Sequence, residues 1–66
     1  MRLIVNNKPE NFPLEHLNQL LQELDLLESK GIAVAVNNKV VPKTSWNAFQ
    51  LTENDTITII RATQGG

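Results

Sequence analysis

The chain has 66 residues, 41% of them hydrophobic, and its six basic and seven acidic side chains give a formal net charge of −1. This length allows one domain, near the lower limit for a self-supporting hydrophobic core, and the apolar fraction is too high for a disordered chain. Nucleic-acid-binding proteins usually carry a basic excess, which is missing here. No apolar stretch approaches the roughly 20 residues that cross a bilayer, and the short apolar start does not resemble a signal peptide. We therefore expect a cytoplasmic globular protein that binds neither nucleic acid nor membrane.

The first elements are a predicted hairpin of two strands. Residues 1–6 are apolar and partly β-branched, which predicts a strand with Leu3 and Val5 on one face and Ile4 on the other. Residues 6–9 have the composition of a turn, and residues 10–12 complete the hairpin as a short second strand.

Residues 14–27 form the clearest predicted helix. Leucines recur there at spacings of three and four, which produces an apolar stripe along one helix face. The leucines of the stripe are Leu14, Leu17, Leu21 and Leu24, with Leu20 and Leu27 beside them. Pro13 suits the first helical turn and Gly31 suits a stop after the helix, although the usual Ser or Thr cap is missing.

The second half of the chain predicts three more strands. Residues 32–36 alternate large and small, so that Ile32, Val34 and Val36 face the helix. Asn37-Asn38 is a two-residue hairpin turn into a strand at residues 40–41, which Pro42 ends. Residues 43–51, with Trp46, Phe49 and Leu51, predict a short helical turn that plugs one end of the core. A turn at residues 52–55 leads into the last strand, residues 56–61.

These elements predict an α+β fold, in which a mixed four- to five-stranded sheet is covered on one face by one helix. If the first and last strands are neighbours in the middle of the sheet, they run parallel, because a long crossover joins them. This is the plan of the ubiquitin-like β-grasp. The domain covers residues 1–61, and residues 62–66 form a flexible C-terminal tail.

Side chains that support catalysis are scarce. His16 is the single histidine, and on the predicted helix it lies about 200° from Leu14, which places it in solvent. The acidic residues are distributed over the outer helix face and one turn, where solvated charges are the ordinary interpretation. The chain contains no cysteine, and neither a metal-ligand spacing nor a glycine-rich phosphate loop is present. We therefore expect no enzyme activity, no bound cofactor and no metal.

The chain ends in Gly65-Gly66, which would place an unhindered carboxylate on a slender arm. Glycine has no Cβ, so such an arm would fit into a narrow active site of another protein. Adenylation by ATP would give this carboxylate a leaving group, and a sulfur donor would then give a thiocarboxylate. Residues 62–66 reach about 17 Å when extended. The alternative is a frayed terminus without a chemical role.

A docking surface is expected beside this arm. If Ile57 and Ile59 point into the core, Ile60 points outward, as does Ile4 on the neighbouring strand. Ile4, Ile60, Arg61 and Ala62 are therefore candidate docking residues. The alternative is that these are the isolated exposed aliphatic residues that any protein carries.

Several segments of the chain match the motifs of a known family. They are Ile32-Ala33-Val34-Ala35-Val36-Asn37, Val40-Val41-Pro42-Lys43, Trp46, Asp55 and Gly65-Gly66. Together they resemble the ThiS family, the small sulfur carriers of bacterial thiamine (thiazole) biosynthesis, and the resemblance covers essentially the whole chain. Two turns depart from the family pattern: Asn54-Asp55 stands where Gly-Asp is frequent, and residues 11–13 look shorter and lack the common Thr cap.

The resemblance implies a β-grasp protein whose Gly66 is adenylated and converted to a thiocarboxylate, with Gly65 as the slender neck. It implies three partners: an E1-like, ThiF-type adenylating enzyme that consumes ATP, a sulfur donor enzyme, and a ThiG-type thiazole synthase. The chain itself would be a protein co-substrate. Two alternatives stay open. One is a molybdopterin-synthase small-subunit-like carrier or ubiquitin-like protein modifier, and the other is a β-grasp interaction module without a reactive terminus.

Overall fold

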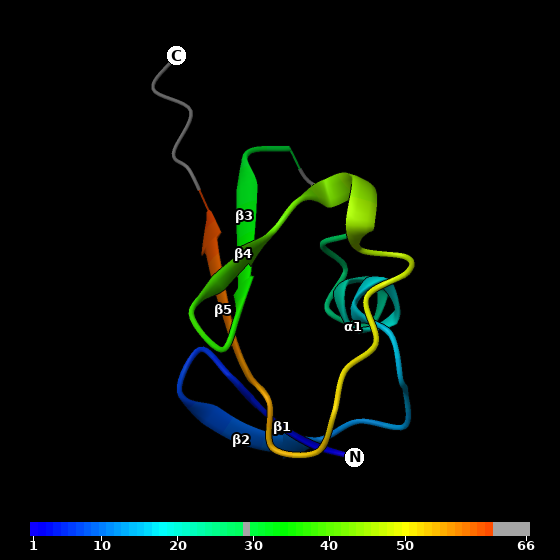
Figure 1. Ribbon diagram of the computed structural model, residues 1–66, viewed down its shortest axis with the longest axis vertical. Helices are drawn as coiled ribbons and strands as arrows, with labels where there is room; N and C mark the ends of the chain where they lie inside the picture. Colours follow the sequence, from blue (N-terminus) through cyan, green and yellow to red (C-terminus); the bar gives the residue numbers. More distant parts are fainter. Residues whose placement is uncertain (29, 62–66) are drawn as a thin grey trace.

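The computed structural model describes residues 1–28 and 30–61 and has the β-grasp plan (Figure 1). In chain order the elements are β1 (Arg2–Val5), β2 (Lys8–Asn11), α1 (Leu17–Glu23), β3 (Ile32–Val36), β4 (Lys39–Val41), the 3₁₀ turn η1 (Lys43–Ser45) and β5 (Thr56–Arg61). The strands predicted at residues 32–36 and 56–61 are confirmed without a change of bounds. The second strand begins at Lys8, two residues earlier than the sequence predicts.

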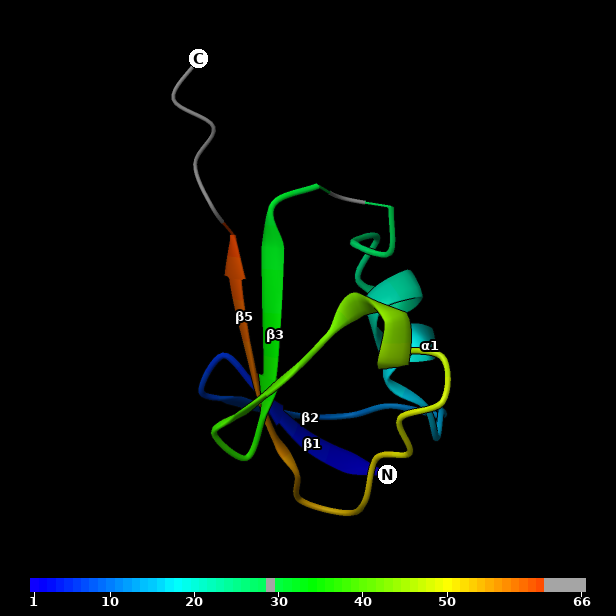
Figure 2. The ribbon, with the colours of Figure 1, turned by 45° about the horizontal axis from the view of Figure 1, so that its top comes forward.

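The five strands form one mixed sheet in the order β2-β1-β5-β3-β4. β1 and β5 are parallel neighbours in its centre, whereas the other neighbouring pairs are antiparallel. The helix α1 lies on one side of this sheet, as Figures 1 and 2 show from two directions. The predicted parallel centre and the single covering helix are therefore confirmed.

The core lies between α1 and the inner face of the sheet. Alternate strand residues point inward, so Leu3, Val34 and Ile57 are almost completely buried. The other buried hydrophobic residues are Phe12, Leu17, Leu20, Leu21, Val36, Val41, Trp46 and Leu51. Trp46 closes one end of this core, and its indole N–H donates a 2.9 Å hydrogen bond to the Val41 carbonyl.

The helix is shorter than the leucine stripe predicts, because tertiary contacts claim the residues before it. Glu15 accepts a 2.7 Å hydrogen bond from the amide of Leu51, and the amide of Leu17 donates to the Phe49 carbonyl. His16 is extended, with φ −115° and ψ 151°, and pairs with Gln50. The prediction that the helix begins at residue 14, with Pro13 suited to its first turn, was therefore wrong.

The side chain of Gln19 closes the start of the helix. Its Oε1 accepts hydrogen bonds from the amides of Glu15 and His16, at 3.0 and 2.9 Å. His16 is half-buried at the N-cap and does not lie on an exposed helix face. At the other end, Asp25 adopts a positive φ of 61° and ends the helix, a role that the sequence assigned to Gly31.

Asparagine supplies the left-handed backbone of the tight turns. The β1–β2 and β3–β4 connections are two-residue turns with both φ values positive: 49° and 70° at Asn6-Asn7, and 50° and 71° at Asn37-Asn38. Positive φ at both central residues is the requirement of the type I′ hairpin turn. Asn54 also has a positive φ, 67°, so it replaces the glycine that is frequent in this turn of the family.

Proline lies at both edges of the sheet. Pro9 is within the edge strand β2 opposite Ile4, and Pro42 follows directly after the edge strand β4. Met1 and Phe12 exchange two backbone hydrogen bonds, so alternation places Pro9 at a non-hydrogen-bonded position whose nitrogen faces outward. Proline is tolerated there because the ladder to β1 needs no donor from it.

Candidate functional site

The candidate site is the end of β5, from which the C-terminal arm departs. β5 runs away from the N-terminal end of the molecule and pairs with β3 up to its last residue, Arg61, which lies opposite Ile32 (Figure 1). The predicted arm residues Ala62, Gly65 and Gly66 lie outside the described residues. What the structure describes is the strand that precedes them in the chain.

An apolar surface lies on the sheet face opposite α1. Val40 and Ile60 are its most exposed large residues, with 74% and 60% of their surface accessible. Between them lie Ala33, which is opposite Ile60, and Ala35, which is opposite Val40. The two alanines are small, so this outer face is shallow between its two larger side chains. We call these four residues the outer patch.

The structure does not bring the predicted docking residues together. Ile4 lies opposite Thr56, four residues along β5 from Ile60, a separation of roughly 13 Å at the rise of a β-strand. Ile4 is also half-buried, whereas Arg61 is exposed and has the same parity as the inward-facing Ile59. Among the predicted docking residues that the structure describes, Ile60 is therefore the one that belongs to the outer patch.

Sequence reasoning missed Val40. Its neighbour Val41 is buried at 6% exposure, so strand alternation turns Val40 outward. The pair Val40-Val41 is symmetric in hydrophobicity, and only the register against Ala35 shows which member faces solvent. The sequence does contain Trp46, whose indole N–H donates a hydrogen bond to the Val41 carbonyl. That contact identifies Val41 as the buried member of the pair, but it can be recognised only in the folded structure.

A hollow of about 360 Å³ opens on the helix side of β5. Its apolar lining comes from the two central strands, from the residue that follows β2 and from the segment after the helix: Val5, Ile59, Phe12, Leu24 and Leu26. Lys8, Glu10 and Arg61 provide charges at this hollow. It exists because α1 ends at Glu23 and leaves the C-terminal half of β5 partly uncovered.

Hydrogen bonds hold β5 at both its ends. At its start, Asn37 accepts from the Thr56 amide at 2.9 Å and donates to the Asp55 carboxylate at 2.9 Å. Near its end, Asn6 Oδ1 accepts from the Ile59 amide at 2.8 Å. The position of the strand is therefore fixed by two turn side chains as well as by its ladders.

Asp55 is the one buried charged residue among those described, with 8% of its surface exposed. Burial alone would raise the pKa of its carboxyl, but hydrogen bonds from the Thr52 amide, the Asn37 amide group and the Thr52 hydroxyl favour the charged form. The net effect is a pKa below the ordinary value of 3.8. This carboxylate stabilises the turn before β5 and lies at the opposite end of that strand from the arm.

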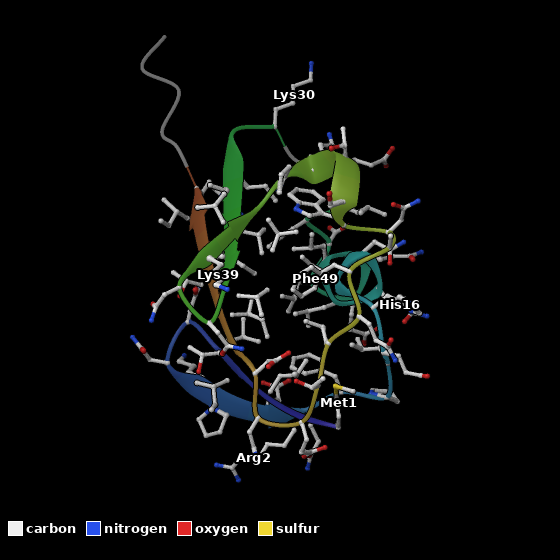
Figure 3. The ribbon with its side chains drawn as sticks, in the orientation of Figure 1. Met1, Arg2, His16, Lys30, Lys39 and Phe49 are labelled. Carbon is white, nitrogen blue, oxygen red and sulfur yellow. The ribbon has the colours of Figure 1, made fainter. Side chains whose placement is uncertain are left out.

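His16 and the metal-binding residue types were also considered as candidate site residues. His16 lies beside α1, on the side of the molecule away from β5 (Figure 3). Within residues 1–28 and 30–61, no group of three or more His, Asp or Glu side chains could hold a metal ion. No helix in this part of the chain is long and apolar enough to cross a membrane.

Comparison with solved structures identifies the same fold in a thiamine biosynthesis protein of Geobacter metallireducens. Its crystal structure, described as ThiS, superposes with a TM-score of 0.83 at 23% sequence identity and covers all of both chains. The NMR solution structure of a thiamine biosynthesis protein from the same organism gives a TM-score of 0.79 at 23% identity, covering all of this chain and 88% of the other. No curated protein sequence matches this chain. The sequence model of the ThiS family, however, matches residues 4–66, and the chain belongs to that family.

Proposed function

We propose that this protein is a sulfur carrier for synthesis of the thiazole moiety of thiamine, and that Gly66 carries the sulfur. The observation that supports this most is the family match, which runs through the whole domain and includes Gly65-Gly66. In this role the protein is a co-substrate of partner enzymes in the cytoplasm and binds no cofactor of its own.

The chemistry takes place at the Gly66 carboxylate in two steps. In a ThiF-type enzyme, a carboxylate oxygen attacks the α-phosphate of ATP, so that an acyl adenylate forms and pyrophosphate leaves. A sulfur nucleophile at the oxidation level of sulfide, supplied through a donor enzyme, then attacks the acyl carbon and displaces AMP. The resulting thiocarboxylate delivers its sulfur to a ThiG-type thiazole synthase. ATP is thus consumed by the activating partner.

The geometry of the domain suits a carrier that docks through one surface while its C-terminus reacts in the partner's active site. The outer patch offers an apolar docking face beside the strand that leads to the arm, and Ile60 and Val40 have the greatest exposed area on it. The arm after Arg61 spans at most about 17 Å. A partner that covers the outer patch therefore receives the terminus within that reach of its docking face.

The test is activation of the full chain by its cognate ThiF-type enzyme with ATP. We expect pyrophosphate release, and, with a sulfur donor, an intact mass higher by the difference between one sulfur and one oxygen atom, confined to the C-terminal peptide. Deletion of Gly66, or Gly65→Trp, should abolish both signals, while the far-UV circular dichroism and the unfolding midpoint stay unchanged. Normal adenylation of Gly65→Trp would refute the proposal.

The partner that consumes the sulfur decides between pathways. Transfer to a ThiG-type synthase supports the thiazole assignment. Transfer to a molybdopterin-synthase large subunit, or attachment to lysine side chains, would replace it with one of the alternatives. A chain lacking residues 62–66 that binds its partners as tightly as the full chain would instead indicate a non-reactive interaction module.

A further inference from the structure

The two sides of β5 are held unequally near the arm. On one side, the register with β3 continues to the last residue, Arg61, opposite Ile32. On the other side, β1 pairs only at Thr56 and Ile57, because its chain turns away after Val5 into the hairpin. The part of β5 that leads into the arm would therefore be supported by β3 alone if backbone pairing were its only restraint.

Asn6 provides the missing support. Its backbone amide donates to the Ile57 carbonyl at 2.9 Å, and its side-chain Oδ1 accepts from the Ile59 amide at 2.8 Å. In a parallel ladder, the Ile59 amide is the donor that the backbone carbonyl of residue 6 would accept if β1 continued beside β5. The side chain of Asn6 thus replaces a backbone carbonyl and adds one rung to the ladder, two residues before the strand ends.

The residue type matters because position 6 has to satisfy two conditions at once. Its φ of 49° is unfavourable for most residues but tolerated by Asn, Asp and Gly. Of these three, only Asn and Asp carry an oxygen that can accept the Ile59 amide. Gly at this position would therefore preserve the turn and lose the rung, whereas Asp would preserve both.

We infer that Asn6 is a positioning residue for the C-terminal arm: its side-chain bond to Ile59 fixes the direction in which β5 leaves the sheet. This inference rests on the proposed function. An extended arm of about 17 Å converts a rotation of about 20° at its base, the usual twist between neighbouring strands, into a displacement of roughly 6 Å at its tip. A misplacement of even about 1 Å at a reacting group costs up to roughly 100-fold in rate. The hydrogen bond between Asn6 and Ile59 therefore reduces the range of positions that Gly66 would sample near the α-phosphate of ATP.

The experiment uses the full chain with its cognate ThiF-type enzyme and measures steady-state pyrophosphate release against carrier concentration. Asn6→Gly should lower kcat by roughly tenfold and change KM little, because the outer patch that contributes docking affinity is untouched. Asn6→Asp should restore most of the loss. Asn7→Gly is the matched control, because Asn7 occupies the same turn with φ 70°, is equally exposed, and makes no side-chain hydrogen bond to β5.

The assay temperature and a hydrogen-exchange measurement separate an effect on arm positioning from an effect on stability. All variants are compared at a temperature well below their unfolding midpoints, where a purely structural role would leave kcat unchanged. Amide hydrogen exchange in the free protein should accelerate at Ile59 and Ile60 in Asn6→Gly but not in Asn7→Gly.

The outcomes are distinct. If the wild-type chain is adenylated and Asn6→Gly keeps the wild-type kcat, the positioning role is overturned. It is equally overturned if Asn6→Gly and Asn7→Gly lose activity to the same extent. If the wild-type chain is not adenylated at all, the proposed function fails, and the exchange rates at Ile59 and Ile60 still decide whether Asn6 restrains the strand end.

Discussion

The two Asn-Asn turns of this protein have nearly the same backbone and different tasks. Their φ values agree within 1° at each position, and in both turns the first asparagine accepts a hydrogen bond from an amide of β5. Asn37 does so at the start of β5 and also donates to the buried Asp55. Asn6 does so near the end of β5, and both asparagines are exposed. The same dipeptide thus bonds to the start of β5 in one place and to the part of β5 near the proposed reactive arm in the other.

The largest loss of stability is expected when the Asp55 carboxylate is removed. Asp55→Ala leaves the Thr52 amide and the Asn37 amide group without their acceptor, and we expect the free energy of unfolding to fall by about 2–4 kcal/mol. Urea denaturation measures this loss. Asp55→Asn, which retains an oxygen acceptor, should lose less. Equal stability of Asp55→Ala and the wild type would show that the network does not support the fold.

Replacing the first asparagine of each turn with glycine tests whether the two turns have different roles. Asn37→Gly removes two hydrogen bonds at the start of β5, and we expect a loss of about 1–2 kcal/mol in the free energy of unfolding, with kcat for adenylation unchanged. Asn6→Gly removes one exposed hydrogen bond, so the loss should be about 0.5–1 kcal/mol, with the fall in kcat described above. The two variants would thus have opposite orders in stability and in activity. The same order in both assays would contradict the division of tasks.

A pH titration addresses Asp55 without disrupting the turn. Its folded-state pKa is lower than its unfolded-state value, so the charged carboxylate contributes stability above the ordinary value of 3.8. That contribution is lost as the pH falls through the folded-state pKa. Urea denaturation between pH 6 and pH 2 (on the order of the range in which carboxyls titrate) should therefore show a steeper decline for the wild type than for Asp55→Asn. Parallel declines would mean that Asp55 is not the group responsible.

The smallest effects are expected at the second position of each turn. Asn7→Gly and Asn38→Gly retain the positive φ values of 70° and 71°, and neither side chain bonds to β5. We expect changes of at most about 0.5 kcal/mol in the free energy of unfolding and no change in kcat. A larger effect at either position would show that the turn backbone, and not the first side chain, holds β5.

The strands were readable from the sequence because their alternation reports burial directly. The bounds of β3 and β5 follow from the period-two patterns of residues 32–36 and 56–61. The long crossover predicted that β1 and β5 run parallel if they are neighbours, and the structure shows that they are. The helix start was not predictable, because the Glu15 carbonyl and the amides of residues 17 and 18 bond to residues 46–51. The spacing of the leucines contains no information about these long-range hydrogen bonds.

For the candidate site, too, local features were predictable from the sequence and long-range contacts were not. The two glycines at residues 65–66 are read directly from the sequence. The exposure of Ile60 was predictable from strand alternation, because it depends only on this residue and its immediate neighbours. The separation of Ile4 from Ile60 depends on register, and the Asn6–Ile59 bond joins residues 53 positions apart. The hollow beside β5 depends on where the helix ends, which the sequence placed four residues too late.

The prolines at the two sheet edges have a consequence for how this protein behaves in concentrated solution. A sheet with an uncovered apolar face is prone to recruit further strands at its edges and to grow into fibrils. Pro9 presents an edge position without a hydrogen-bond donor, and Pro42 ends β4 after three residues. Both features disfavour growth by strand addition at the sheet edges, which would leave the outer patch accessible to a partner.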